Sequence, residues 1–177
     1  TRRIAYVRDR GYFLLFDTLT PVDDQEHSYQ SLFHLDSTAA QADEGKVVTT
    51  ANEGQSNLVI IPVTPVDVEI VKGKTDEPVQ GWSNGPWREV PTAIYKAAGK
   101  GTLRMVYVLE LVGSGELRTV TAARVLEEKA DAIAIELTLV DGTRQVIAQR
   151  DMLEMESTIA GIVSDREVIV EDRGADG

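Results

Sequence analysis

Two residues of this chain have side chains that could bind a metal ion within an apolar, strand-like environment. Asp17 follows the apolar run Tyr12–Phe16, and His34 follows Phe33. Zinc accepts carboxylate oxygen and imidazole nitrogen, so Asp17 and His34 together could provide two of its ligands. A buried hydrogen bond between the two side chains would satisfy them as well, and the residues alone favour this simpler interpretation. In both cases Asp17 requires a partner, because burying an unpaired carboxylate is costly.

The chain contains a second histidine, His27, an odd number of positions before His34. Side chains alternate between the two faces of a strand, so the two imidazoles are expected on opposite faces. They could share one site only if a bulge shifted the alternation. We therefore expect His27 to lie at the rim of the fold or in a loop.

A second candidate site lies in the segment Gly81–Arg88, which contains both tryptophans of the chain. Indole faces stack on sugar rings, and the guanidinium of Arg88 could pair with a ligand carboxylate through two hydrogen bonds. The alternative is that the indoles close one end of the fold. For Trp82, which follows a glycine, the closing role is favoured, whereas Trp87 and Arg88 are candidate substrate-binding residues.

The elements that must position these residues are short apolar segments separated by turn signals, a pattern typical of antiparallel β-sandwiches. Asp9–Gly11 and Asp141-Gly142 predict hairpin turns. We predict a two-sheet, supersandwich-like antiparallel fold of about ten or more strands, with one domain over residues 1–170 and a polar tail over residues 171–177. The strands are expected at residues 3–8, 12–19, 28–35, 47–50, 58–62, 66–71, 92–97, 103–112, 119–126, 132–140, 143–150, 159–163 and 167–170. Between them, residues 73–91 are predicted to form a long loop, a feature that is usually functional in a compact domain.

Composition excludes several classes of function. The net charge of −11 argues against nucleic acid as a partner, since phosphate neutralisation requires clustered lysine and arginine. No apolar run reaches the roughly 20 residues that span a bilayer, so no membrane partner is predicted. The absence of cysteine excludes disulfides and thiolate ligands. The chain has no initiator methionine, and we expect it to be part of a longer protein.

Several motifs together resemble a known family. They are Arg3–Val7, Tyr12–Asp17, His27-Ser28-Tyr29, Phe33-His34-Leu35, Gly81-Trp82-Ser83 with Pro91, and Met105–Leu111. With these motifs the chain resembles the C-terminal β-sandwich domain of the heparinase II/III-like polysaccharide lyases, oligoalginate-lyase-like members included. The resemblance covers most of the chain and is weakest in its last part.

The resemblance implies a bacterial parent enzyme, periplasmic, secreted or cytoplasmic, that cleaves uronic-acid polysaccharide by β-elimination. In this family an N-terminal α/α toroid carries most of the catalytic machinery, so the present chain is expected to be inactive alone. The resemblance also implies a structural zinc, with Asp17 and His34 matching two ligand positions and a third ligand expected upstream of Thr1. The alternative function is a non-catalytic carbohydrate-binding or structural β-sandwich module.

Overall fold

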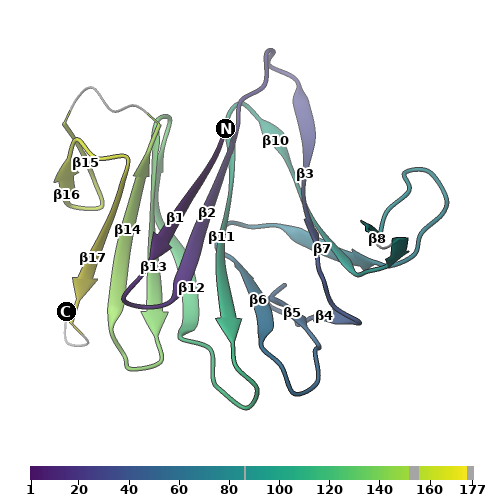
Figure 1. The fold of residues 1–177 in the computed structure, drawn as a ribbon. Coiled ribbons are helices and arrows are strands. Elements are labelled where there is room, and N and C mark those ends of the chain that lie inside the picture. Colours follow the sequence, from purple (N-terminus) through teal and green to yellow (C-terminus); the bar gives the residue numbers. More distant parts are fainter. Residues whose placement is uncertain (86, 152–155, 175–177) are drawn as a thin grey trace. The chain divides into compact units, whose positions relative to one another are not determined.

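The computed structural model describes residues 1–85, 87–151 and 156–174, which form strands and connecting turns without a helix (Figure 1). The strands pair in antiparallel fashion into several sheets, which confirms the predicted all-β, sandwich-like fold. The chain divides into two compact units, Thr1–Leu117 and Arg118–Gly177. That residues 1–170 behave as one domain stays a prediction.

The first unit contains a large sheet, a small sheet and a separate hairpin. The large sheet has, in spatial order, β1 (Arg2–Val7), β2 (Tyr12–Leu19), β11 (Leu103–Val112), β6 (Asn57–Pro62), β5 (Val48–Thr50) and β4 (Ala40–Ala42). The small sheet has β3 (Glu26–His34), β10 (Thr92–Lys100) and β7 (Asp67–Val71). The hairpin consists of β8 (Trp82–Asn84) and β9 (Trp87–Glu89).

The predicted hairpin at the start of the chain is confirmed. The turn between β1 and β2 is closed by hydrogen bonds from the amides of Arg10 and Gly11 to the carbonyl of Val7. Gly11 has a φ of 76°, a conformation that glycine adopts without the steric cost of a side chain. The register of this hairpin places Asp17 opposite Arg2, which determines the partner of the buried carboxylate.

The two sheets of the first unit pack face to face, as Figure 1 shows for β3 and β10 beside β2 and β11. Their shared core joins Leu15 and Tyr107 of the large sheet to Ala93 and Tyr95 of the small sheet. Phe33 of β3 packs its ring against both tyrosines in edge-on geometry, with ring centroids 5.8 and 5.2 Å away. Period-two alternation turns one face of each strand into this core and leaves the other face outward.

The two core tyrosines should make the fold sensitive to alkali. Burial raises the pKa of both Tyr95 and Tyr107 above their ordinary value. The stabilisation that depends on keeping these two side chains protonated is therefore fully present below the tyrosine pKa of the unfolded state, about 10. It is lost as the pH rises toward and through the higher pKa values of the folded state. We expect the urea midpoint of unfolding to fall between about pH 9 and pH 11. Replacing both tyrosines by phenylalanine should reduce that fall, whereas the exposed control Tyr6→Phe should not. An equal fall in the original chain, the double variant and Tyr6→Phe would show that the two core tyrosines do not cause the alkali sensitivity.

The segment predicted as a long loop, residues 73–91, contains the hairpin of β8 and β9. Gly81 enters this hairpin with a φ of 84°, and its carbonyl accepts hydrogen bonds from the amides of Gly73 and Val90. A Cβ atom on Gly81 would lie 2.6 Å from the Cα of Lys72, so the hairpin lies against the end of β7 at a distance that only glycine allows. The prediction missed the strands because each has three residues, too few to show a hydrophobic period.

The second unit has a four-stranded sheet and a short hairpin. The sheet has, in order, β12 (Val120–Lys129), β13 (Ala132–Leu139), β14 (Arg144–Arg150) and β17 (Val168–Arg173), and the hairpin has β15 (Ser157–Ile159) and β16 (Ile162–Ser164). Ala134, Val146 and Ile159 belong to the core between them. The predicted Asp141-Gly142 turn is present, with Gly142 at a φ of 82°. β17 continues to Arg173, beyond the residue where the polar tail was expected to begin, and residues 175–177 of that tail lie outside the described residues.

The described residues contain no helix that is long and apolar enough to cross a membrane.

Candidate functional site

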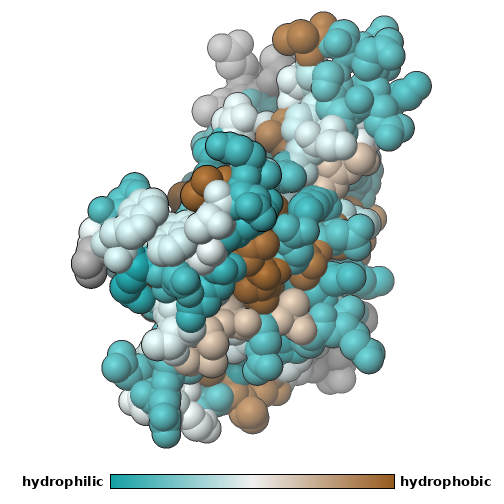
Figure 2. Space-filling model, turned by 90° about the vertical axis from the view of Figure 1, so that its right-hand side faces the viewer, coloured by the Kyte–Doolittle hydropathy of each residue, from teal (hydrophilic) through white to brown (hydrophobic). Residues whose placement is uncertain are grey.

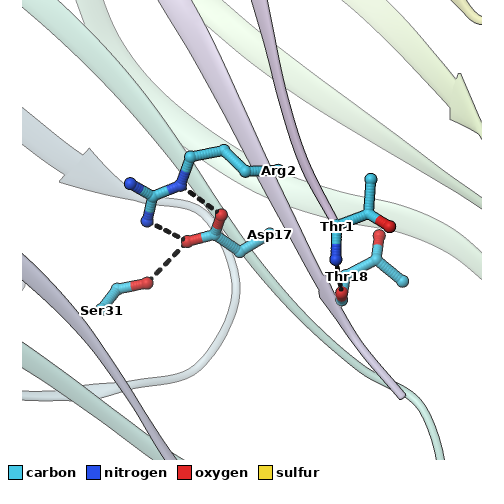
Figure 3. A network of polar contacts seen from close by, with 5 residues as sticks. All are labelled: Thr1, Arg2, Asp17, Thr18 and Ser31. Atoms are coloured by element: carbon cyan, nitrogen blue, oxygen red, sulfur yellow. Dashed lines mark hydrogen bonds and ion pairs between the residues drawn. The ribbon is translucent and has the colours of Figure 1, made fainter.

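Asp17 is buried between the two sheets of the first unit and has three strong polar contacts (Figure 3). The Arg2 guanidinium donates to both carboxylate oxygens, with Nε–Oδ1 at 2.6 Å and Nη2–Oδ2 at 2.7 Å. The Ser31 hydroxyl of β3 donates to Oδ2 at 2.6 Å. The hydrogen bond to Asp17 raises the pKa of Arg2, so the guanidinium side of this bidentate ion pair remains charged. The carboxylate therefore has the partners that its burial requires.

The predicted contact between Asp17 and His34 is wrong. Asp17 belongs to β2 of the large sheet, whereas His34 is the last residue of β3 in the small sheet and is exposed. The reason is strand alternation, because Ser31 points inward to Asp17 and His34, three residues later, points to the opposite face.

This arrangement does not fit a zinc ion shared by Asp17 and His34. Both oxygens of Asp17 are engaged by Arg2 and Ser31, and the imidazole lies on the outward face of another sheet. In the part of the chain that the structure describes, no three histidine, aspartate or glutamate side chains gather closely enough to hold a metal ion.

His34 instead lies at the second candidate site, beside the β8–β9 hairpin. One open hollow, of about 360 Å³, is lined by His34, Asp36, Asn84 and Arg88. A second hollow, of about 230 Å³, is lined by His34 and Asn84 together with both tryptophans. The structure thus brings together three of the four predicted site residues, His34, Trp87 and Arg88. We call Trp82, Trp87 and the residues lining the first hollow the indole site.

The two tryptophans of the indole site stack on each other. Their ring centroids are 5.2 Å apart and their planes differ by 10°, because antiparallel pairing places them near each other across the hairpin. Trp82 is half-buried, and its indole N–H donates to the Lys74 carbonyl at 3.0 Å. Trp87 is 66% exposed, so one of its faces is available to a ligand. An exposed indole face of this kind can pack against the apolar face of a ligand.

Polar groups surround these rings. The Arg88 guanidinium forms an ion pair with the Asp36 carboxylate, and both side chains remain substantially exposed. Together with the His34 imidazole and the Asn84 amide, they provide donors and acceptors for hydroxyl groups. The site is therefore suited to hydrogen bonding a hydrated ligand. Its openness to water makes it unsuited to reactions that depend on a desolvated cleft.

His27 lies near the start of β3, at the end of the strand away from His34, as expected for a rim position. Its Nε2 atom lies 2.7 Å from Oδ1 of Asp23, and this hydrogen bond lowers the pKa of the Asp23 carboxyl. The two histidines thus lie at opposite ends of one strand. The structure does not bring them together.

Sequence reasoning missed Asp36 and Asn84 as members of the site. Asn84 had an available signal, because Asn84-Gly85 is a typical hairpin dipeptide and a hairpin there would have placed Trp82 beside Trp87. The sequence contained no such signal for Asp36, because its contact with Arg88 depends on how the hairpin folds back on β3.

No protein-family model and no curated protein matches this chain.

Proposed function

We propose that this chain is the C-terminal β-sandwich domain of a heparinase II/III-like polysaccharide lyase and that it binds uronic-acid polysaccharide at the indole site without cleaving it. The lyase assignment rests on the sequence resemblance, with which the all-β fold is consistent. The observation that supports binding is the exposed face of Trp87, held by stacking on Trp82 and flanked by Arg88.

Binding without cleavage follows from what β-elimination requires. The reaction needs a base, an acid and a group that neutralises the substrate carboxylate, all held in one geometry. In the indole site the imidazole of His34 is exposed, and the guanidinium of Arg88 already pairs with Asp36. The catalytic groups are therefore assigned to the toroid domain of the parent enzyme.

The alternative, a carbohydrate-binding module unrelated to lyases, uses the same site in the same way. The exposed indole pair favours sugar binding in either protein, because stacking depends on the ring face and not on later chemistry. The sequence that precedes Thr1 in the gene separates the two, since a helical toroid there supports the lyase.

The test is calorimetric titration of the isolated chain with alginate and heparan oligosaccharides, followed by ultraviolet detection of unsaturated uronate in the same samples. We expect binding to one of these ligands and no unsaturated product. Product formation by the pure chain would contradict the assignment of catalysis to another domain. Failure to bind any oligosaccharide would contradict the proposed function itself.

A further inference from the structure

The indole site is one end of a longer series of hollows on the outward face of the small sheet. A middle hollow is lined by Gln80 of the loop together with Gln30, Glu69 and Lys96 of the strands. Gln80 also lines the hollow beside the tryptophans, so these two hollows adjoin. We call the whole series the groove.

The groove continues past the middle hollow toward the start of β3. The last hollow is lined by Ser28, Gln30, Asp67 and Lys96, and it shares Gln30 and Lys96 with the middle one. Ser28, Gln30 and His34 occupy the same face of one strand by period-two alternation. At the rise of a β-strand, His34 and Ser28 are about 20 Å apart, which is several times the width of one sugar ring.

The chemistry of the groove is that of a surface for hydroxyl groups. Gln30, Gln80 and Ser28 offer neutral donors and acceptors. Lys96 forms an ion pair with Glu69, Nζ–Oε2 2.5 Å, so its charge is balanced in place. Figure 2 views the molecule from the side on which Figure 1 shows β3, β7 and β8, and hydrophilic residues predominate there.

Lys74 differs from the other cations of the groove. Among the described residues its ammonium group has no hydrogen-bond or ion-pair partner, although its backbone is held by Gln80 and by the indole N–H of Trp82. Arg88 and Lys96, in contrast, each hold a carboxylate. Lys74 is thus a positioned cation in the middle of the groove, beside the indole site, with its charge available to an anionic ligand.

We infer that a linear uronate oligosaccharide lies along this groove, with one sugar on Trp87, its chain extending past Gln30 toward Ser28, and one carboxylate on the ammonium of Lys74. The inference rests on the proposed function and extends it from a single stacking site to a chain-length-dependent one. It assigns selection for uronate to Lys74.

The first test measures how affinity depends on ligand length. The isolated chain is titrated calorimetrically with the disaccharide, tetrasaccharide and hexasaccharide of alginate and with those of heparan. We expect the hexasaccharide to bind about tenfold or more tightly than the disaccharide, since each added sugar contacts another part of the groove. Equal affinities for all three would overturn the groove while leaving the proposed function in place. Binding of none of them would overturn both.

The second test examines the carboxylate contact. Lys74→Ala should weaken hexasaccharide binding about tenfold and should leave binding of the carboxyl-reduced hexasaccharide unchanged. Lys72→Ala is the matched control, because the Lys72 ammonium donates to the Thr38 carbonyl and does not line the groove. An equal loss with both ligands, or an effect of Lys72→Ala as large as that of Lys74→Ala, would overturn the assignment of Lys74.

Discussion

Replacing Asp17 with alanine is expected to lower the free energy of unfolding by about 2–3 kcal/mol. Asp17 is 5% exposed, and its carboxylate is the acceptor for both Arg2 and the buried hydroxyl of Ser31. Its removal leaves the Ser31 hydroxyl without this bond and the guanidinium without its counterion. Because the Arg2 side chain is 48% exposed, water offsets part of that loss, which places the effect below that of breaking a fully buried pair.

The measurement is the urea midpoint of the variant against that of the original chain. Ser31→Ala should cost about 1 kcal/mol, since it removes one hydrogen bond and leaves the ion pair intact. Asp23→Ala is the matched control on an exposed carboxylate and should change stability by less than about 0.5 kcal/mol. A midpoint for Asp17→Ala equal to that of Asp23→Ala would show that the buried ion pair does not stabilise the fold.

Replacing Trp87 with alanine is expected to weaken oligosaccharide binding at least about tenfold. Trp87 presents the most exposed large aromatic surface of the site and is supported from behind by Trp82, so its loss removes both the stacking face and its rigidity. Folding should be unaffected, since a side chain that is 66% exposed contributes little to the core.

Calorimetric titration with alginate hexasaccharide measures this effect, with Trp87→Phe and Val22→Ala as companions. Trp87→Phe should retain part of the affinity because an aromatic face remains. Val22, a fully exposed apolar residue of the loop between β2 and β3, tests whether general surface hydrophobicity matters, and its variant should bind normally. Normal binding by Trp87→Ala would show that the exposed indole face of Trp87 does not take part in oligosaccharide binding.

The parts of the fold that sequence predicted well are those with local signals. The β1–β2 hairpin follows from a glycine with positive φ between two apolar runs, and the Asp141-Gly142 turn follows in the same way. β12, which contains helix-forming residues such as Ala122 and Ala123, is nevertheless a strand, as predicted. Pairing with β13 outweighs the intrinsic helix propensity there.

The parts that sequence did not predict depend on contacts between distant residues. The expected strand at residues 159–163 is a hairpin, with β15 and β16 joined at Ala160-Gly161, both at positive φ. The partner of Asp17 was expected to be His34 because the family resemblance implies that both are ligands of one structural zinc. Within the structure, cross-strand register favours Arg2 and strand alternation favours Ser31, and neither effect is visible in residue types alone.

Asp36 and Lys74 were not predicted as binding residues for a similar reason. Each is an ordinary charged residue in sequence, and each reaches the site only through the way in which residues 73–90 fold over the small sheet. Trp87 and Arg88 were predictable because the chain has only two tryptophans, both within one short segment, and Arg88 follows the second of them directly.

The hydrogen bond from Ser31 to Asp17 also has a consequence for the strand that carries it. β3 faces the core through Tyr29, Ser31 and Phe33 and faces outward through Gln30 and His34. A slip of β3 by one residue would exchange these two sets, bringing the amide of Gln30 into the core and the ring of Phe33 into water. Ser31 is the position whose hydroxyl finds an acceptor on the large sheet, so its bond to Asp17 disfavours the slipped register. A polar contact inside the sandwich thereby selects which side chains are displayed on its outer surface.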